Sequence, residues 1–253
     1  MADEGFEVHV VRVAALAEPQ RRAIYQFVVG RDGPVSKDDA AAALGVARSV
    51  AAFHLDRLVA DGLLSTEFRR LSGRRGPGAG RPAKLYRRAA REVAVSLPPR
   101  HYGFVADLLA TAVEASAGDG TPVADALRDA ARHRGADLGA AVRGRAGDRP
   151  SRGALAATAL ALLEEQGYEP RMEDGQVVLV NCPFHALADR HRELVCGMNH
   201  DLLAAVSDAV GDDVLEAHLV PTEGRCCVRL DVDRRALAAL RRGRAGEGPG
   251  RAE

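Results

Sequence analysis

Several features that point to particular classes of protein are missing from this sequence. It has no Trp and only 4% aromatic residues, so its apolar cores must be built mainly from Ala, Leu and Val. No apolar run approaches the roughly 20 residues that span a bilayer, and the N-terminal stretch MADEGFEVHV has no signal-peptide hydrophobic region. We therefore expect no membrane partner and a cytoplasmic location, where cysteine thiols stay reduced.

The sequence also lacks the motifs of several large enzyme classes. It has no P-loop, no GxSxG, no HExxH and no dinucleotide-binding glycine motif after a predicted strand. Cys196 and His200 could form a catalytic pair, but no third group that would orient the histidine can be assigned. We therefore expect no enzymatic activity, and a Cys/His-dependent enzyme remains the alternative of another class.

Net charge is absent as well, since 35 Lys and Arg balance 35 Asp and Glu. The balance hides an asymmetry along the chain. Residues 63–91 contain nine Lys or Arg and a single acid, Glu67, whereas residues 160–233 contain fifteen acids and five Arg. A polyanion would be attracted to the first segment and repelled by the second, so we expect a DNA-binding half and a half with another role.

Residues 36–62 predict two helices joined by a short turn. Ser36, followed by Asp39, is a suitable N-cap for a first helix that ends at Gly45, and the second helix ends at Gly62. We expect the second helix to bury Val50, Phe53, Leu55, Leu58 and Val59. This order is the helix-turn-helix layout, in which the second helix enters the major groove of DNA.

A basic segment follows these helices and alternates like two strands around a Gly/Pro-rich tip, from residue 63 to residue 88. A hairpin in this position is a wing, whose positive charges suit DNA phosphates. The residues expected to approach base edges are Arg48, Ser49, His54 and Arg57. Those expected at phosphates or in the minor groove are Arg69, Arg70, Arg74, Arg75, Arg81 and Lys84.

Two sequence stretches in this region, LGVARSVAAFHLDRLVADGLL and GRPAKLY, resemble winged-helix bacterial regulators of the ArsR/DeoR-like kind. The resemblance implies a winged helix-turn-helix domain over residues 8–92, which also contains a helix predicted over 14–30. Metal-sensing ArsR relatives often carry a cysteine pair in the helix before the wing. This chain has no cysteine before Cys182, so that sensor site is absent.

The remainder of the chain predicts a helical segment, a mixed segment and a tail. The helical segment covers 98–145, and its first apolar stripe is expected to form a dimer interface, an ordinary core helix being the alternative. The stripe consists of Tyr102, Val105, Leu108, Leu109, Ala112 and Val113. Residues 151–233 predict a helix, a hairpin, a helical region broken near His191 and a second hairpin, so the fold class is α+β. The Gly/Arg/Glu-rich tail over 241–253 is expected to be disordered.

The four cysteines all fall in the last third of the chain. Cys182 follows the predicted strand VVLV, Cys196 lies in the next helical region, and Cys226 and Cys227 open the last strand. An α+β fold can gather such positions at one edge, although adjacent strand residues point to opposite faces, so only one of the last two easily faces a shared site. Three thiolates suit zinc or an iron–sulfur cluster. Inert core cysteines remain the alternative.

The stretches NCPFHALADRHRELVCGMNHDLLAAV and GRCCVRL resemble the sensor domain of SufR-type regulators, which repress iron–sulfur assembly operons, and more distantly the vinyl-reductase-like ligand domains. The resemblance implies a homodimeric repressor that holds an iron–sulfur cluster on Cys182, Cys196 and Cys226 of its sensor domain over 151–233. The sequence departs from the pattern by lacking a fourth cysteine between Cys196 and Cys226. The candidate fourth ligands are His185, His200 and Cys227.

A second type of regulator stays open at this point. The C-terminal domain could instead bind a small organic effector, with structural zinc or no metal. The apolar residues available for such a pocket are Leu155, Leu162, Val178, Leu194, Met198, Leu202 and Leu203.

Overall fold

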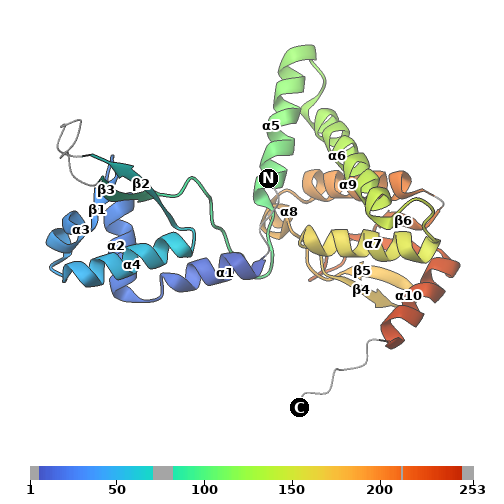
Figure 1. Ribbon diagram of the computed structural model, residues 1–253. Helices are drawn as coiled ribbons and strands as arrows, with labels where there is room; N and C mark the ends of the chain where they lie inside the picture. Colours follow the sequence, from blue (N-terminus) through green and yellow to red (C-terminus); the bar gives the residue numbers. More distant parts are fainter. Residues whose placement is uncertain (1–5, 71–81, 212, 247–253) are drawn as a thin grey trace. The chain divides into compact units, whose positions relative to one another are not determined.

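The computed structural model describes residues 6–70, 82–211 and 213–246, and the chain forms two compact units (Figure 1). The first unit is Met1–Val95 and the second is Ser96–Glu253. Helices and two small antiparallel sheets together confirm the predicted α+β class. None of the described helices is long and apolar enough to cross a bilayer.

The first unit contains four helices and a three-stranded sheet among its described residues. In chain order the elements are α1 (Phe6–Ala15), α2 (Pro19–Val29), β1 (Val35–Ser36), α3 (Lys37–Leu44), α4 (Arg48–Ala60), β2 (Leu64–Arg69) and β3 (Ala83–Arg88). The antiparallel strands have the order β1-β3-β2. The tip between β2 and β3, residues 71–81, lies outside the described residues.

The helix predicted over 14–30 is in fact interrupted before Pro19. The Glu18 carboxylate accepts hydrogen bonds from the backbone N–H groups of Gln20 and Arg21 and so caps a new helix, α2. Proline is well suited to the first turn of that helix, because its missing N–H would have no partner there. The residues before Glu18 form a separate helix, α1.

The ends of α3 are those that the sequence predicts. Ser36 Oγ accepts a hydrogen bond from the Asp39 N–H at 3.1 Å, and the Asp39 carboxylate accepts one from the Ser36 N–H at 2.8 Å. This reciprocal capping box satisfies backbone donors that the first turn leaves free. Gly45 ends the helix at φ 65°, in the left-handed region that glycine adopts without strain. The turn then directs the chain into α4.

The burial of α4 corrects the sequence-based prediction at two positions. Phe53, predicted to be buried, is 63% exposed, whereas His54, predicted to face DNA bases, is only 8% exposed. The buried stripe consists of Ala51, His54, Leu55 and Leu58, which follow one helical face at i, i+3, i+4 and i+7. Neighbouring residues on a helix are about 100° apart, so a stripe through His54 turns Phe53 outward.

Among its described residues, the second unit contains six helices and a four-stranded antiparallel sheet of order β4-β5-β7-β6. The helices are α5 (Tyr102–Asp119), α6 (Val123–Ala146), α7 (Arg152–Glu165), α8 (His185–Arg190), α9 (Arg192–Val210) and α10 (Arg234–Gly246). The strands are β4 (Pro170–Glu173), β5 (Gln176–Leu179), β6 (Leu215–Leu219) and β7 (Val228–Val232). Both predicted hairpins and the predicted break near His191 are confirmed, but α10 continues to Gly246, into the tail for which disorder was predicted.

The long helices α6 and α9 lie in close contact along their lengths. Two glycines of α6 permit this approach, since a Cβ at Gly135 would lie 2.8 Å from the Ala205 Cβ, and one at Gly139 would lie 2.8 Å from the Val206 carbonyl oxygen. Helix α9 also contacts β6 and β7, so it joins the helical layer to the sheet. It carries Cys196 in its second turn.

Candidate thiol site and nucleic-acid surface

The fold brings all four cysteines into one buried cluster. Cys182 follows the end of β5, Cys196 lies on α9, and Cys226 and Cys227 immediately precede β7. Each is between 4% and 7% exposed, and all four are free thiols in the same apolar core. The backbone N–H of Cys226 donates to the Leu179 carbonyl at 2.9 Å, which fixes the end of β5 beside the start of β7. The fold therefore gathers the four cysteines, as predicted, at one end of the two central strands.

The thiols form one hydrogen-bonded series, in the order Cys182, Cys226, Cys227 and Cys196. A hydrogen bond from Cys226 is the main cause that lowers the pKa of Cys227 to about 6, and burial opposes it. The same donor lowers the pKa of Cys182. Burial, followed by the bond to Cys227, raises the pKa of Cys196 to about 12, and the two sulfur partners of Cys226 raise its pKa well above the ordinary range. Without a metal, Cys226 and Cys196 are thus the S–H donors of the series, and the pKa values of Cys182 and Cys227 are lowered.

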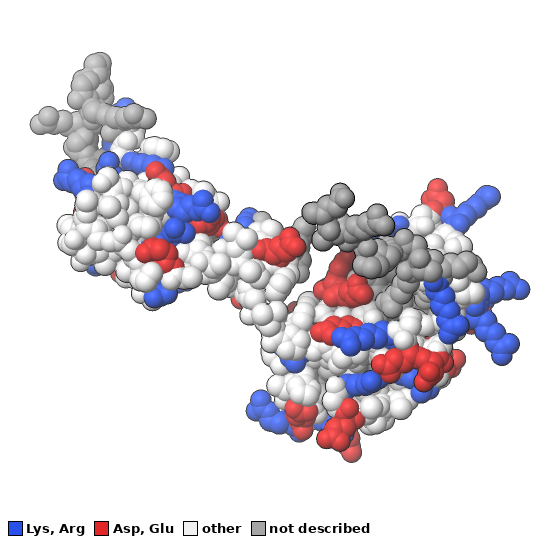
Figure 2. All heavy atoms as spheres, turned by 90° about the horizontal axis from the view of Figure 1, so that it is seen from below, with Lys and Arg blue, Asp and Glu red and all other residues white. Residues whose placement is uncertain are grey.

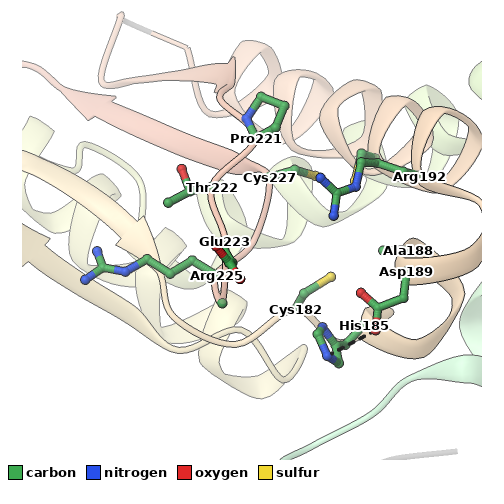
Figure 3. Close-up of a pocket in the computed structure, with 12 residues that line it drawn as sticks. Cys182, His185, Ala188, Asp189, Arg192, Pro221, Thr222, Glu223, Arg225 and Cys227 are labelled. Carbon is green, nitrogen blue, oxygen red and sulfur yellow. Dashed lines mark ion pairs between the residues drawn. The ribbon is translucent and has the colours of Figure 1, made fainter.

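A pocket of about 270 Å³ opens beside this cluster (Figure 3). Its lining residues are Cys182, His185, Ala188, Asp189, Arg192, Cys196, Pro221, Thr222, Glu223, Gly224, Arg225 and Cys227. Figure 3 shows the Cys182 side chain pointing into the space, with Cys227 and Arg192 across from it. Cys226 instead borders a separate hollow of about 180 Å³. One vicinal cysteine thus lines the pocket, as alternation suggests, but it is Cys227 and not the predicted Cys226.

The two candidate histidine ligands lie in different places. His185 lines the pocket and has its Nε2 atom 3.4 Å from Asp189 Oδ2. His200 does not line it, and its Nε2 atom lies 3.3 Å from the Ala217 carbonyl oxygen on β6. His200 is therefore not placed to serve as the fourth ligand. Its ring forms its hydrogen bond with β6 and not with Cys196. Among the predicted fourth ligands, the structure brings His185 and Cys227 to the pocket.

The ligand atoms at this site are of the type that a soft metal ion or an iron–sulfur cluster binds. Four neighbouring sulfurs are the ligands that zinc and iron–sulfur clusters prefer. In residues 6–70, 82–211 and 213–246, no three His, Cys, Asp or Glu side chains converge on a single point suitable for a metal ion. Binding would therefore need changes in side-chain rotamer, which the pocket beside the sulfurs has room to accept.

Two further polar residues at the thiol cluster were not predicted from the sequence. Asn199 is 1% exposed, and its Nδ2 atom donates a hydrogen bond to Cys226 Sγ at 3.2 Å. The buried Tyr168 hydroxyl donates to Asn199 Oδ1 at 2.5 Å. The only local signal for Asn199 is its position three residues after Cys196, on the same face of a helix. Tyr168 lies 31 residues from Asn199, and no local pattern connects the two.

The segment before Cys182 is fixed by a second polar group. Asn181 Nδ2 donates to the Gly167 and Pro99 carbonyls at 2.6 and 3.0 Å, and its Oδ1 accepts a hydrogen bond from Arg100. Arg100 also donates to the Cys182 carbonyl at 3.2 Å. The Asn181 side chain thus ties the start of the second unit to the loop that carries the first cysteine.

The candidate DNA surface lies on the exposed side of α4 and on the β2–β3 hairpin. Arg48, Ser49 and Arg57 are exposed, as predicted, but the Arg48 side chain lies 3.0 Å from Asp38 and that of Arg57 lies 3.1 Å from Asp61. The pair of Arg48 with Asp38 is exposed on both sides and contributes only about 0–1 kcal/mol, so a phosphate can replace that carboxylate, whereas the Asp61 side chain is only 7% exposed. His54 is excluded from this surface by its burial, with Nδ1 3.7 Å from Glu18 Oε2.

The predicted phosphate contacts on the hairpin are partly described. Arg69 and Arg70 are exposed, and Arg69 lies 2.8 Å from Glu67. Lys84 lies 2.6 Å from Asp56 Oδ1 on α4, an oxygen that also accepts a hydrogen bond from the Tyr86 hydroxyl at 2.8 Å. The other three predicted contacts, Arg74, Arg75 and Arg81, lie outside the described residues. Figure 2 shows basic side chains among acidic ones on the face that it presents.

The stripe predicted for dimerisation and the residues predicted for an effector pocket are largely core. Val105, Leu108 and Ala112 of α5 are buried within the second unit, whereas Tyr102 and Val113 remain exposed. The effector candidates Leu155, Leu162, Met198, Leu202 and Leu203 are each at most 2% exposed. Val178 is half-buried and Leu194 is exposed. The hollow bordered by Leu202 and Leu203 has about 10 Å³ and cannot hold an organic molecule.

Comparisons with known proteins give no relative for this chain. No protein-family model, no curated protein sequence and no solved structure matches it. Any function assigned to it therefore depends on the residues and geometry described above.

Proposed function

We propose that the chain is a winged helix-turn-helix transcription regulator that binds double-stranded DNA as a homodimer and acts as a repressor. The observation that carries the proposal is the order α3, left-handed turn at Gly45, α4, β2, β3, in a sheet of order β1-β3-β2. A helix pair followed by an antiparallel hairpin suits insertion of the second helix into the major groove. Helix α4 leaves Arg48, Ser49 and Arg57 exposed for that contact.

We further propose that the thiol pocket of the second unit senses an iron–sulfur cluster or redox state, with zinc as the alternative metal. Cys182, Cys196 and Cys227 would hold the group, with Cys226 beside them and His185 as a candidate fourth ligand. Such a group would supply covalent, redox-sensitive bonds that join the segment after β5, the segment before β7 and helix α9. These cysteines come from three separate elements, so holding them together restricts how α9 moves against the sheet. If binding of the group changes the affinity for DNA, binding of DNA must change the affinity for the group by the same factor.

The DNA-binding part is tested without knowledge of the operator. The full-length protein selects duplexes from a random library, and fluorescence anisotropy gives the affinity for the selected duplex. Arg48→Ala and Arg57→Ala should each weaken that binding by about 5- to 150-fold, which corresponds to the loss of one base or phosphate contact of about 1–3 kcal/mol. Arg145→Ala is the matched control, because Arg145 is an exposed, ion-paired arginine of the second unit. Equal affinities for all four proteins would contradict the proposal.

A further inference from the structure

The buried amide of Asn199 occupies an unusual place for a polar side chain. It lies on α9 in the largest apolar core, beside Cys196, Cys226 and Cys227, with 1% exposure. A buried amide is costly unless its donors and acceptor find partners. Asn199 finds one on each side, the Tyr168 hydroxyl at its oxygen and the Cys226 sulfur at its nitrogen.

The tyrosine determines which end of the amide faces the cysteines. Tyr168 donates to Asn199 Oδ1 at 2.5 Å, so the oxygen is occupied and the NH₂ group faces Cys226 Sγ at 3.2 Å. The Tyr168 ring is itself held, because it packs edge-on against Phe184 at 6.2 Å between ring centres. Tyr168 comes from the segment between α7 and β4, so the orientation of Asn199 depends on a contact far away in the sequence.

The strength of this hydrogen bond depends on the charge that the sulfur carries. A neutral thiol is a weak acceptor, whereas a thiolate or a metal-bound sulfur carries negative charge and accepts an N–H group strongly. Outer hydrogen bonds to ligand sulfurs orient them and adjust the electronic properties of a metal centre. A satisfied core asparagine would more ordinarily donate to backbone oxygen, as Asn181 does to Gly167 and Pro99.

We propose that Asn199, oriented by Tyr168, is a positioning residue whose amide group donates N–H···S hydrogen bonds to Cys226 and to the neighbouring Cys227. The bond to Cys227, a ligand in the proposed site, weakens electron donation from that sulfur to a bound metal. The inference rests on the proposed metal-binding function of the thiol pocket. It assigns Asn199 and Tyr168 roles outside the ligand set, since neither would touch the metal. Tyr168 acts only through Asn199.

Cobalt(II) is the probe, because its thiolate-to-metal absorption band reports how readily the sulfur gives up an electron. The metal-free full-length protein is titrated with cobalt(II) as wild type, Asn199→Leu, Tyr168→Phe and the double variant. Loss of the N–H group should shift the band of Asn199→Leu to longer wavelength, and Tyr168→Phe should shift it in the same direction by less. The double variant should match Asn199→Leu. Ser207→Ala is the control, because Ser207 is a buried residue of α9 whose hydroxyl donates to the Leu203 carbonyl.

An unchanged band in cobalt-loaded Asn199→Leu would overturn the inference, and so would a shift of equal size in Ser207→Ala. If Asn199→Leu does not fold, Tyr168→Phe decides, since it removes a single hydroxyl. If the wild type binds no cobalt(II), the proposed metal function fails, and alkylation of the metal-free protein by iodoacetamide tests the inference separately. Labelling at Cys227 relative to Cys182 should then fall at least threefold in Asn199→Leu. An unchanged ratio would overturn it.

Discussion

Asp56 provides the sharpest test of the proposed DNA surface, because its carboxylate binds Lys84, a residue predicted to contact phosphates. It lies on the exposed side of α4, where its carboxylate accepts hydrogen bonds from Lys84 at 2.6 Å and from the Tyr86 hydroxyl at 2.8 Å. A negative charge at this position repels phosphates and also occupies a lysine that was predicted to contact them. Asp56→Asn removes the charge and keeps an oxygen that the Tyr86 hydroxyl can bond.

The expected magnitude follows from the exposure of the pair. The side chains of Lys84 and Asp56 are 38% and 55% exposed, so the ion pair contributes at most about 1 kcal/mol to folding and its loss should leave the fold intact. A lysine released to a phosphate adds about 0.9 to the slope of log affinity against log salt. Raising the salt from about 50 mM to about 200 mM should therefore weaken Asp56→Asn by about threefold more than the wild type.

The measurement is fluorescence anisotropy with the selected duplex and with an unrelated duplex, each over a series of salt concentrations. Asp56→Asn should bind both duplexes more tightly than the wild type at low salt, with the steeper slope on both. Glu165→Gln serves as the control, because it releases Arg145 in the second unit in the same way. If the slope of Asp56→Asn equals that of the wild type, releasing Lys84 from Asp56 adds no phosphate contact and the reasoning is refuted. If both variants steepen the slope equally, the effect is one of net charge and the proposed surface is wrong.

Three other predictions follow from burial, packing and ionisation. Because His54 is buried, His54→Ala should lower the free energy of unfolding by about 1–3 kcal/mol and leave the salt slope of DNA binding unchanged. A changed slope with unchanged stability would instead show that His54 contacts DNA. Gly135→Ala should lower the free energy of unfolding, measured with denaturant, by about 1–3 kcal/mol, because its Cβ would overlap the Leu202 carbonyl oxygen. Gly144→Ala in the same helix has open space and should raise that free energy by about 0.5–1 kcal/mol. Equal effects would show that α6 and α9 do not pack as described. In the metal-free protein the pKa of Cys227 is about 6 against an ordinary 9.0, so the unfolded chain binds more protons than the folded chain between these values. The free energy of unfolding should therefore rise with pH in this range, by up to about 1.4 kcal/mol per pH unit, and this gain should be lost as pH falls through 6. A Cys227→Ser variant that shows the same rise would contradict the assignment.

Local sequence patterns were sufficient for part of the first unit and misleading at one helix. The capping box at Ser36 and the stop at Gly45 depend on residues only a few positions apart, and both were predictable. The buried side of α4 was not, because its stripe begins at Ala51, a small residue that gives little hydrophobic signal, while Phe53 gives a strong one. Packing against α2 and α3 decides which side of α4 is buried, and no pattern within α4 contains that information.

The thiol site divides in a similar way. That the ends of β5 and β7 and the start of α9 would lie together was predictable from the order of elements. The choice between Cys226 and Cys227 was not, since both precede β7, which begins at Val228, and strict alternation applies only within a strand. The pairing of Tyr168 with Asn199 also depends on tertiary packing alone.

The most direct test of the whole account is the DNA affinity of one protein sample before and after removal of its metal. The chain is purified anaerobically, its iron, sulfide and zinc are measured, and anisotropy with the selected duplex is recorded for the loaded and metal-free forms and for Cys182→Ser. We predict stoichiometric iron and sulfide in the wild type, loss of both in Cys182→Ser, and different DNA affinities for the loaded and metal-free forms. A metal-free, fully folded wild type that binds the duplex with the same affinity after reconstitution with iron and sulfide would contradict the account.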